Sequence, residues 1–448
     1  MISARPLRRI LGLGFGLALA FGTMVGVGIL RLPGVVAAAA GSPALIVVCW
    51  SLGGLYALMG AVSVSELAAM YPEAGGFRVY ARRAFGDRAG FVVGWIDWLA
   101  NAAVLAYAAV SAVEFAGTLW PAVTQYESLA AIAILGVFTA MHSAGLRMGS
   151  TITSALSVAI GVSLLVLVVG CWVAPAARPA GLVASPAHLF SAAALLALVP
   201  AIRAILTAYD GWYAPIYTAE ESVDASRTLP RAIIGATLLV VVLYLTLNVA
   251  LLRVLPVREL AASKLPVAAA AQAVLPRGSA ALMTALSILI TLSLINSNAI
   301  TGPRVLFSMA REGWVSSRAA AVSRGGTPHV ALAMTTLTSA AMILTGGFNQ
   351  LIALFAVLIL LYYVAAFLAV FALRRRAPEA PRPYRAFGYP VSTAVVLAGS
   401  MSFLVAAIVQ DWRSGVTALL FLSACVPAYA FASRSRRARM PELTPDPT

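Results

Sequence analysis

Charged residues are scarce in this chain, and lysine occurs once, as Lys264. Of the 448 residues only 10% are charged and 61% are hydrophobic, which lies far outside the range of soluble domains. The three cysteines fall inside apolar runs, so no disulfide framework is visible, and the three scattered histidines show no metal-ligand spacing. We therefore expect no metal or other cofactor. The sequence also lacks a GxxxxGK[ST] loop, which argues against a nucleotide-driven pump.

Long apolar runs fill most of the chain. A helix needs about 20 apolar residues to cross a bilayer, and runs of this length recur throughout the sequence. Twelve spans are predicted, at about 10–39, 43–70, 90–118, 128–145, 150–174, 191–219, 232–254, 279–311, 328–346, 350–373, 389–409 and 414–433. The first run is too long for a cleaved signal peptide and leads directly into a second span. The sequence predicts an all-α polytopic membrane protein.

Basic residues fall mainly on one side of these spans. With the N-terminus inside, 23 of the 31 Lys and Arg residues lie in cytoplasmic segments and 6 in outer segments. The outer residues are Arg178, Arg253, Arg258, Lys264, Arg277 and Arg413. This asymmetry predicts cytoplasmic N- and C-termini for a protein of the cytoplasmic membrane. Topology and anionic lipids account for the net charge of +15, so no nucleic-acid partner is expected.

Two predicted spans are interrupted. The first contains GTMVGVG at 22–28 and the sixth contains TAYDGW at 207–212. Irregular backbone at membrane depth is tolerated only against protein or a wet cavity, and breaks at matching positions of two inverted halves mark substrate sites in transporters. The free N–H groups of one half-helix suit a carboxylate and the free carbonyls of another suit an ammonium or sodium ion. Alternatively, the glycines only allow close helix packing.

Several segments resemble the signature regions of one transporter family. They are GTMVGVGILRLPG (22–34), SELAAMYPEAGGFRVYARRAFGDRAGFVVGW (65–95), TAYDGWYAPIYTAEES (207–222), GPRVLFSMAREG (302–313) and RPYRAFGYP (382–390). Together they resemble the amino acid–polyamine–organocation (APC) superfamily, and within it the L-type amino acid transporters and their bacterial relatives. The resemblance implies 12 transmembrane helices in a LeuT-like fold with helices 1 and 6 broken. It implies a first five-helix repeat at 1–180, an inverted repeat at 185–376, and two further helices with a cytoplasmic tail at 377–448.

The resemblance implies that the first break binds substrate largely through its main chain. The N–H groups of Gly26, Val27 and Gly28 would face the carboxylate of an amino acid. The carbonyl of Met24 would receive its ammonium group. Thr23 could assist through its hydroxyl or could merely bond back within its own helix, and both alternatives stay open.

The second break would complete this site. By the same resemblance the carbonyls of Thr207 and Asp210 would share the ammonium, and Gly211 would permit the unwound backbone. L-type members usually have a large aromatic residue where this chain has Thr207, and that ring helps to close the outer gate. Tyr209, Trp212 or Tyr213 could replace it, or the pocket is roomier than in those members.

Ionisable residues inside the spans are costly to bury and are candidates for coupling or gating. Asp210 could hold a transported proton or favour a cationic substrate, or it could only cap the half-helix ends. Arg31 and Arg203 lie near the breaks, and either could neutralise Asp210. Glu114 is a second candidate counter-ion or proton carrier. Asn296 in the eighth span matches a family asparagine, and the hydroxyls around it could bind sodium or act as packing groups.

Acidic residues at the inner helix ends suggest a gate. Glu66, Glu220 and Glu221 could pair there with loop arginines such as Arg78. Asp97, near the inner end of the third span, is expected to pack against polar groups of the inner loops.

Two features of some relatives are missing. A lysine that relatives have in the fifth span corresponds here to Ile160, so no ammonium group can stand in for a bound sodium ion. The 119–127 loop has no cysteine, and a disulfide-linked heavy subunit is therefore not expected.

The pattern predicts a secondary transporter of amino acids, neutral ones in particular, rather than an enzyme. It would work by alternating access in contact with membrane lipids, as an exchanger or a proton symporter, with sodium as a further alternative. Two other functions stay open: transport of a polyamine or another organic amine, and a non-transporting amino acid sensor.

Overall fold

The computed structural model describes residues 9–175, 198–275, 279–410 and 422–439, together with Leu7, Val416, Leu419 and Leu420. In these parts the chain is helical, with one isolated β-bridge between Leu11 and Ser222. Predicted span residues 191–197 and the predicted outer residues Arg178, Arg277 and Arg413 lie outside the described parts.

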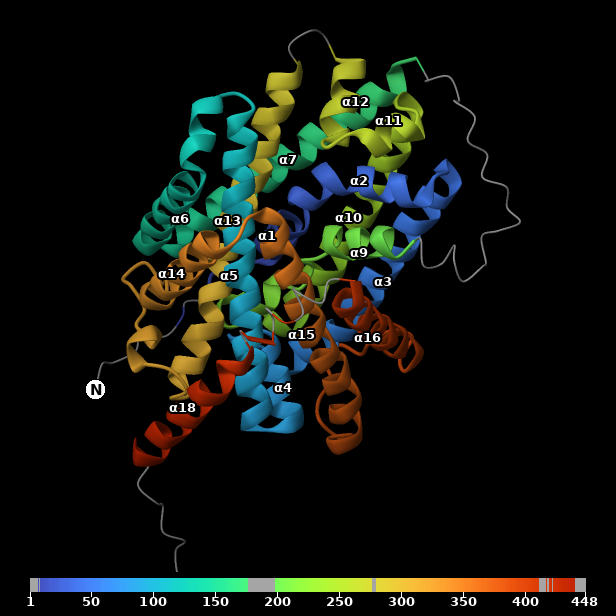
Figure 1. The fold of residues 1–448 in the computed structure, drawn as a ribbon. Coiled ribbons are helices and arrows are strands. Elements are labelled where there is room, and N and C mark those ends of the chain that lie inside the picture. Colours follow the sequence, from blue (N-terminus) through green and yellow to red (C-terminus); the bar gives the residue numbers. More distant parts are fainter. Residues whose placement is uncertain are drawn as a thin grey trace, which may run out of the picture.

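Long apolar helices make up the body of the molecule (Figure 1). They are α3 (Pro43–Met70), α5 (Asp87–Gly117), α6 (Glu127–Ala144), α7 (Leu146–Val173), α10 (Ala225–Val254), α13 (Ser279–Arg311), α15 (Phe348–Arg376) and α16 (Val391–Gln410). Among the described residues these give 8 candidate membrane spans, or 9 when the bent pair α1 (Leu13–Met24) and α2 (Val27–Ala40) counts as one. The protein is a polytopic membrane protein.

Shorter elements cover the remaining predicted spans. The sixth is represented by α9 (Val199–Ala208) and the 3₁₀ helix η3 (Ala214–Glu221), and the ninth by α14 (His329–Thr345). The described part of the last span ends in α18 (Cys425–Arg439). The connecting elements are η1 (Pro121–Tyr126), α4 (Phe77–Phe85), α11 (Val257–Ala262), α12 (Pro266–Val274) and η4 (Ser317–Ala320).

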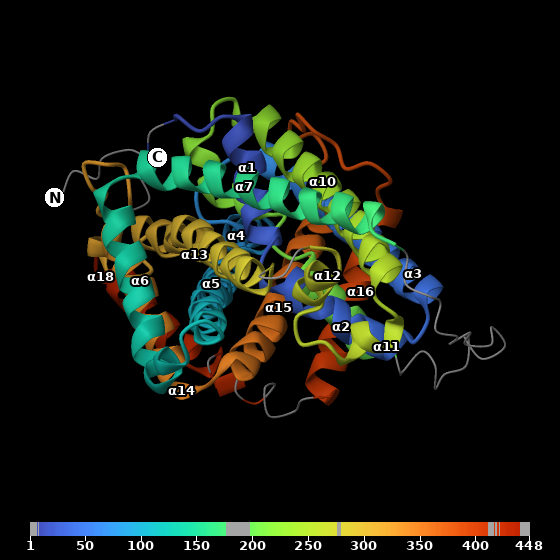
Figure 2. The ribbon, with the colours of Figure 1, turned by 90° about the horizontal axis from the view of Figure 1, so that it is seen from above.

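The helix α5 lies at the centre of the bundle because its sequence is rich in small residues. In its middle, residues 100–113 read ANAAVLAYAAVSAV, and every one of them is buried. Small side chains let neighbouring backbones approach closely, and α5 packs on α13, α15, α14 and α4. Figure 2 shows α5 enclosed between α13 and α15. This helix forms one wall of the site described below.

The two interrupted spans pack on each other and on the central helices. The half-helix α1 contacts α10, α7 and α13, whereas α2 contacts α9 and α11. In Figure 1, α4 lies toward the lower end of the molecule and α11 and α12 toward the upper end. We call these ends the α4 side and the α11 side.

Candidate functional site

The first break separates α1 from α2 by two residues, Val25 and Gly26, and bends the span by 45°. Val25 has φ −82° and ψ 80°, and Gly26 is extended at φ −120° and ψ −156°. No side chain caps the N-terminus of α2. The first N–H groups of a helix lack intrahelical partners, so those of Val27, Gly28 and Ile29 are available to a ligand.

The second break runs over residues 209–213, between α9 and η3. Gly211 adopts φ +106°, and a Cβ added there would lie 2.7 Å from the carbonyl carbon of Thr23. Both the backbone conformation and the close contact require glycine. The hydroxyl of Thr23 lies 2.8 Å from the Gly211 carbonyl and 2.8 Å from the Leu19 carbonyl. The two breaks are therefore in direct contact, and Thr23 can donate to either carbonyl.

Opposite ends of two half-helices also meet. A Cβ added to Gly28 would lie 3.0 Å from the Cα of Ala208, the last residue of α9. The N-terminus of α2 has a partial positive charge and the C-terminus of α9 a partial negative one. This contact brings free donors and free acceptors of the main chain to one place.

A polar cavity adjoins the contact between the breaks; we call it the break cavity. It has about 360 Å³ of space between its atoms. Its lining residues are Thr23, Asn101, Val104, Tyr107, Asp210, Gly211, Tyr213, Ala214, Tyr217, Leu294, Asn298, Thr301, Phe355 and Tyr362. Thr23 of α1, the second break, η3 and the helices α5, α13 and α15 contribute to this wall.

Asp210 is held by tyrosines in this cavity. Its carboxylate accepts a hydrogen bond of 2.6 Å from the hydroxyl of Tyr363 and one of 3.2 Å from that of Tyr213. In the described part of the chain Asp210 has no ion-pair partner. Hydroxyl donors lower the cost of burying a carboxylate without removing its charge.

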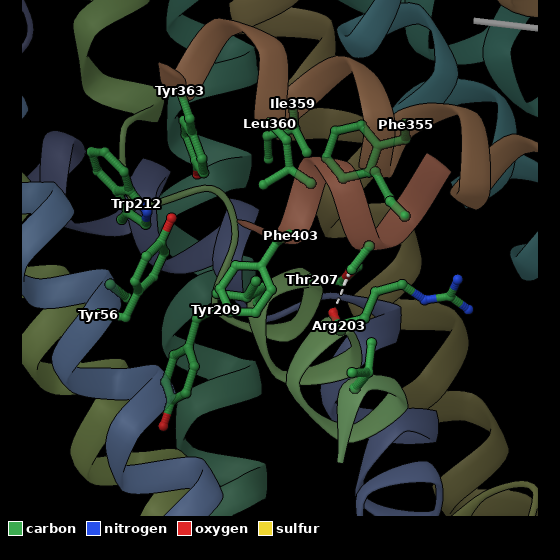
Figure 3. Close-up of a pocket in the computed structure, with 16 residues that line it drawn as sticks. Tyr56, Arg203, Thr207, Tyr209, Trp212, Phe355, Ile359, Leu360, Tyr363 and Phe403 are labelled. Carbon is green, nitrogen blue, oxygen red and sulfur yellow. Dashed lines mark hydrogen bonds between the residues drawn. The ribbon is translucent and has the colours of Figure 1, made fainter. Parts of the chain in front are cut away.

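The prediction that Arg31 or Arg203 neutralises Asp210 is wrong. Arg31 instead lies 2.5 Å from the carboxylate of Glu114, and its guanidinium group lies 4.6 Å from the centre of the Phe348 ring. The Arg203 side chain is exposed, and Figure 3 shows its guanidinium pointing away from the neighbouring aromatic rings. A charged group is hydrated more easily near the opening of a cavity than inside it. This explains why Arg31 and Arg203 lie in the more open space outside the break cavity.

The carbonyl of Met24, predicted to receive an ammonium group, already has two donors. It accepts 2.8 Å from the hydroxyl of Tyr244 and 2.9 Å from the N–H of Gly26. Tyr209 lies on the same flank, where its hydroxyl donates 3.2 Å to the carbonyl of Trp50. An ammonium ligand of Met24 would have to share or displace these bonds.

An apolar pocket lies beside the break cavity, between α3, α9, α15 and α16 (Figure 3). Aromatic and aliphatic side chains supply most of its wall, and the Trp212 ring stacks on Tyr363 with centroids 5.5 Å apart. Thr207 lines it too, with its hydroxyl turned back 3.0 Å to the carbonyl of Arg203. Phe355 lines both the apolar pocket and the break cavity.

A wide vestibule opens on the α11 side. Its space between atoms, about 2830 Å³, is several times that of the break cavity. Val27 and Gly28 at the start of α2 line it, as do Thr207 and Arg203, which it shares with the apolar pocket. The charged residues of its wall are Arg31, Arg203, Lys264 and Glu114. Basic groups therefore outnumber acidic ones in this wall.

Ion pairs close the α4 side. Glu312, the residue after the end of α13, lies 2.5 Å from Arg78 and 2.6 Å from Arg82, both on α4. The other pairs that join separate elements there are Arg304 with Glu221, Arg311 with Glu220, and Arg374 and Arg382 with Glu66. The prediction that these acids pair with arginines holds for Glu66 with the loop residue Arg382, but the partners of Glu220 and Glu221 are Arg311 and Arg304 of α13 rather than Arg78 or Arg82.

Asn296 belongs to a different polar cluster. Its amide oxygen lies 2.9 Å from the ring of His142, and its amide nitrogen donates 2.8 Å to the hydroxyl of Thr153. These residues join α13 to α6 and α7, and Asn296 does not line the break cavity.

Three serines surround α1 just before the first break. A Cβ added to Gly22 would lie 3.0, 3.1 and 3.4 Å from the hydroxyls of Ser297, Ser157 and Ser293. Ser157 donates 2.8 Å to the carbonyl of Ala18, whereas the buried hydroxyls of Ser293 and Ser297 have no hydrogen-bond partner among the residues that the structure describes. Ser157 of α7 therefore contacts α1 through its hydroxyl. It lies one turn before Ile160, the position that corresponds to the lysine of some relatives.

Several residues that surround the predicted site residues were not predicted from the sequence. Tyr363 and Tyr244 contact the breaks from distant spans, and Glu312 pairs with two arginines of α4. The adjacent tyrosines LYYV in the tenth span were the one available signal, since paired hydroxyls are unusual in an apolar run.

The fold and the site define a polytopic helical membrane protein with a polar cavity enclosed between two interrupted helices. The chain belongs to the amino acid permease family, whose model matches residues 16–429. It is similar to the serine/threonine exchanger SteT of Bacillus subtilis, with 26% identity covering 96% of this chain and 98% of the relative. It is also similar to the large neutral amino acids transporter small subunit 2, at 29% in Oryctolagus cuniculus (85% of this chain, 72% of the relative) and 28% in Homo sapiens (85% and 72%). The chain is a transporter of the APC superfamily rather than an enzyme.

Proposed function

We propose that this protein carries neutral amino acids across the cytoplasmic membrane by alternating access. The observation that supports this most is the contact of the α2 N-terminus with the α9 C-terminus, at Gly28 and Ala208. Main-chain donors beside main-chain acceptors suit the carboxylate and the ammonium of one zwitterion. The relatives, which are named for serine, threonine and large neutral amino acids, support the same substrate class.

In this proposal the two breaks share the amino acid. The N–H groups of Val27 and Gly28 face the carboxylate from the vestibule, and the N–H group of Gly26 joins them once it releases the Met24 carbonyl. The carbonyls at the end of α9, including that of Thr207, and the carbonyl of Asp210 take the ammonium. Five further residues contribute to the site. Thr23 and Met24 would contact the substrate through oxygen atoms that already make hydrogen bonds, and Gly211 provides the backbone conformation. The side chains of Tyr209 and Trp212 form part of the pocket wall.

The substrate side chain enters the apolar pocket. This pocket shares Arg203 and Thr207 with the vestibule, so a side chain can reach it from there. Its wall favours neutral side chains because an unpaired charge is costly to bury there. An organic amine without a carboxylate is the weaker candidate: Asp210 already accepts two hydrogen bonds, and the vestibule wall is mainly basic.

The proposal includes a full membrane topology. It has 12 transmembrane helices in a LeuT-like arrangement, with inverted repeats at 1–180 and 185–376 and two further helices in 377–448. The α4 side, where the arginine-rich segments lie, faces the cytoplasm together with both termini. No disulfide-linked subunit is required.

Three driving forces are compatible with this proposal: exchange for a second amino acid, symport with a proton and symport with a sodium ion. An exchanger needs only a second amino acid, as the name of SteT suggests for that relative. A symporter needs a proton or a sodium ion. Sodium is supported by the unpartnered hydroxyls of Ser293 and Ser297 beside α1, because hydroxyls and free carbonyls at a helix break can coordinate it.

Uptake into proteoliposomes tests the proposal. Vesicles preloaded with unlabelled amino acid, and empty vesicles with an inward proton or sodium gradient, are compared for uptake of labelled L-serine, L-threonine and L-leucine. We expect uptake in at least one of these conditions and none in protein-free liposomes. Uptake of putrescine instead would support an amine carrier. Saturable binding without any flux would support a sensor and would overturn the proposal.

A further inference from the structure

Two carboxylates are connected to the break cavity by tyrosine hydroxyls: the partly buried Asp210 lines it, and Asp97 is bonded to Tyr217, which lines it. Asp97 of α5 is fully buried and accepts 2.6 Å from the hydroxyl of Tyr217. Asp210 accepts from Tyr213 and Tyr363. Asp97 was expected only to pack against the inner loops, and its connection to the cavity through Tyr217 was not anticipated.

The hydroxyls form a nearly continuous series. Those of Tyr213 and Tyr362 are 2.5 Å apart, and Tyr213 donates 3.2 Å to Asp210. Tyr213, Tyr362 and Tyr217 all line the break cavity. The cavity has room for a water molecule, and a water placed between Tyr362 and Tyr217 would complete the series.

The charges around the two carboxylates differ. Tyr107 of α5, Tyr362 and Tyr363 of α15, and Tyr213 of its own segment lie near Asp210, and in the described parts of the chain no cation pairs with it. For a carboxylate without a cation, protonation reduces the cost of burial.

Asp97 has Tyr217 and the amide of Asn101 as donors, and Arg78 of α4 is the nearby cation. Arg78 itself is bound to Glu312. Asp97 therefore lies next to the ion pairs that close the α4 side, where a released proton would leave.

We propose that a proton passes from Asp210 to Asp97 through these tyrosines and drives amino acid uptake. The proton leaves the Asp210 carboxyl group for the Tyr213 hydroxyl, which gives its own proton to Tyr362. Tyr362 passes one to the cavity water, the water passes one to Tyr217, and Tyr217 protonates Asp97. Each hydroxyl and the water gains one proton and loses one, so the net change is one proton moved. This inference rests on the proposed transport function and names its coupling ion.

The test uses purified full-length protein in liposomes with a potassium–valinomycin clamp. Labelled L-serine and L-leucine are supplied with an inward proton gradient to empty vesicles, or without a gradient to preloaded vesicles. We expect Asp97→Asn, Tyr217→Phe and Asp210→Asn to reduce gradient-driven uptake at least tenfold. We expect exchange into preloaded vesicles by Asp97→Asn and Tyr217→Phe to stay within threefold of that of the unchanged protein.

Two matched substitutions serve as controls. Tyr429→Phe removes a hydroxyl from α18, which packs on α5 away from the cavity, and Asp224→Asn changes an exposed acid. We expect both to transport normally in both assays. Gradient-driven uptake that survives in Asp97→Asn and Tyr217→Phe would overturn the route, while exchange would still support the transporter.

A direct measurement covers the case in which the variants do not fold. A pH dye inside vesicles of unchanged protein should report acidification when L-serine or L-leucine is added outside. Uptake of amino acid without acidification, or uptake driven by sodium alone, would overturn proton coupling. Absence of both exchange and gradient-driven uptake would instead contradict the proposed function.

Discussion

Gly211 shows how one residue fixes the contact between the two interrupted spans. Its φ of +106° is rarely adopted by residues with a side chain, and its Cα faces the main chain of Thr23. Every other residue type would strain the backbone and push α1 away from the second break. The glycine is thus required by geometry as well as by flexibility.

Gly211→Ala should reduce amino acid binding more than tenfold, because strain of about 1–3 kcal/mol would separate the breaks. Gly347→Ala is the matched control, since Gly347 has φ −82° and no atom within 4 Å of an added Cβ. Scintillation proximity binding of labelled L-leucine measures the effect, and thermal unfolding in detergent checks folding. Equal affinity of both variants would contradict the proposed role of Gly211.

At the scale of elements, the uncapped N-terminus of α2 is the part of the site that recognises a carboxylate. No side chain competes for its N–H groups, and the contact with α9 holds it beside free carbonyls. Because the main chain binds the carboxylate, the side chains at the start of α2 need only be small enough to fit. Gly26 has Leu294 within 3.1 Å of an added Cβ.

A substrate analogue tests this element without any mutation. L-leucinamide lacks the negative charge but keeps the ammonium group and the side chain. A helix terminus stabilises a partly buried charge by up to about 2 kcal/mol, so the amide should compete about 30-fold less well than L-leucine. Competition at equal concentration would mean that α2 does not bind the carboxylate.

Gly26→Val provides the complementary change in the protein. The added side chain would collide with Leu294 and tilt the first turn of α2, so L-leucine affinity should fall at least tenfold. Leu294→Ala in the same chain should restore part of it by removing the collision. A Gly26→Val protein that folds and keeps full affinity would contradict the proposed cradle.

The positions of helices and of their breaks are the features that the sequence predicts best, because they depend on residues close together in the chain. The run 43–70 matches α3 (Pro43–Met70), and the glycines at 22–28 mark the first break. Partners distant in sequence are different: Asp210 and Tyr363 are 153 positions apart, and Glu66 and Arg374 are 308 apart. Such pairs depend on how the helices pack. The sequence therefore predicts which residues are polar within the spans, but only the structure shows their partners.

At the scale of the whole molecule, one side is open and the other is closed. The vestibule on the α11 side extends to α2, while ion pairs that involve α3, α4, η3, α13 and α15 close the α4 side. Alternating access requires these pairs to separate when the vestibule closes. The strength of the pairs therefore influences how often each side is open.

Glu312→Gln should shift the protein toward opening on the α4 side. Removing this carboxylate leaves Arg78 and Arg82 without their shared partner after the end of α13, which weakens the closed state. A cysteine placed at Thr301 in the break cavity, with the three buried native cysteines replaced, reports access. Membrane-impermeant reagent on the α4 side should label it severalfold faster, whereas Asp224→Asn should cause no change. Unchanged labelling would show that Glu312 does not hold this side closed.

The contact between Thr23 and Gly211 has a consequence for selectivity. No space separates the two interrupted spans there, so a displacement of one must be passed to the other. A side chain that fills the apolar pocket displaces α9, and through Gly211 this displacement reaches α1 and the helices that pack on it. Two amino acids with the same affinity could then differ in turnover number, because the fit of the side chain would set the rate of the conformational change.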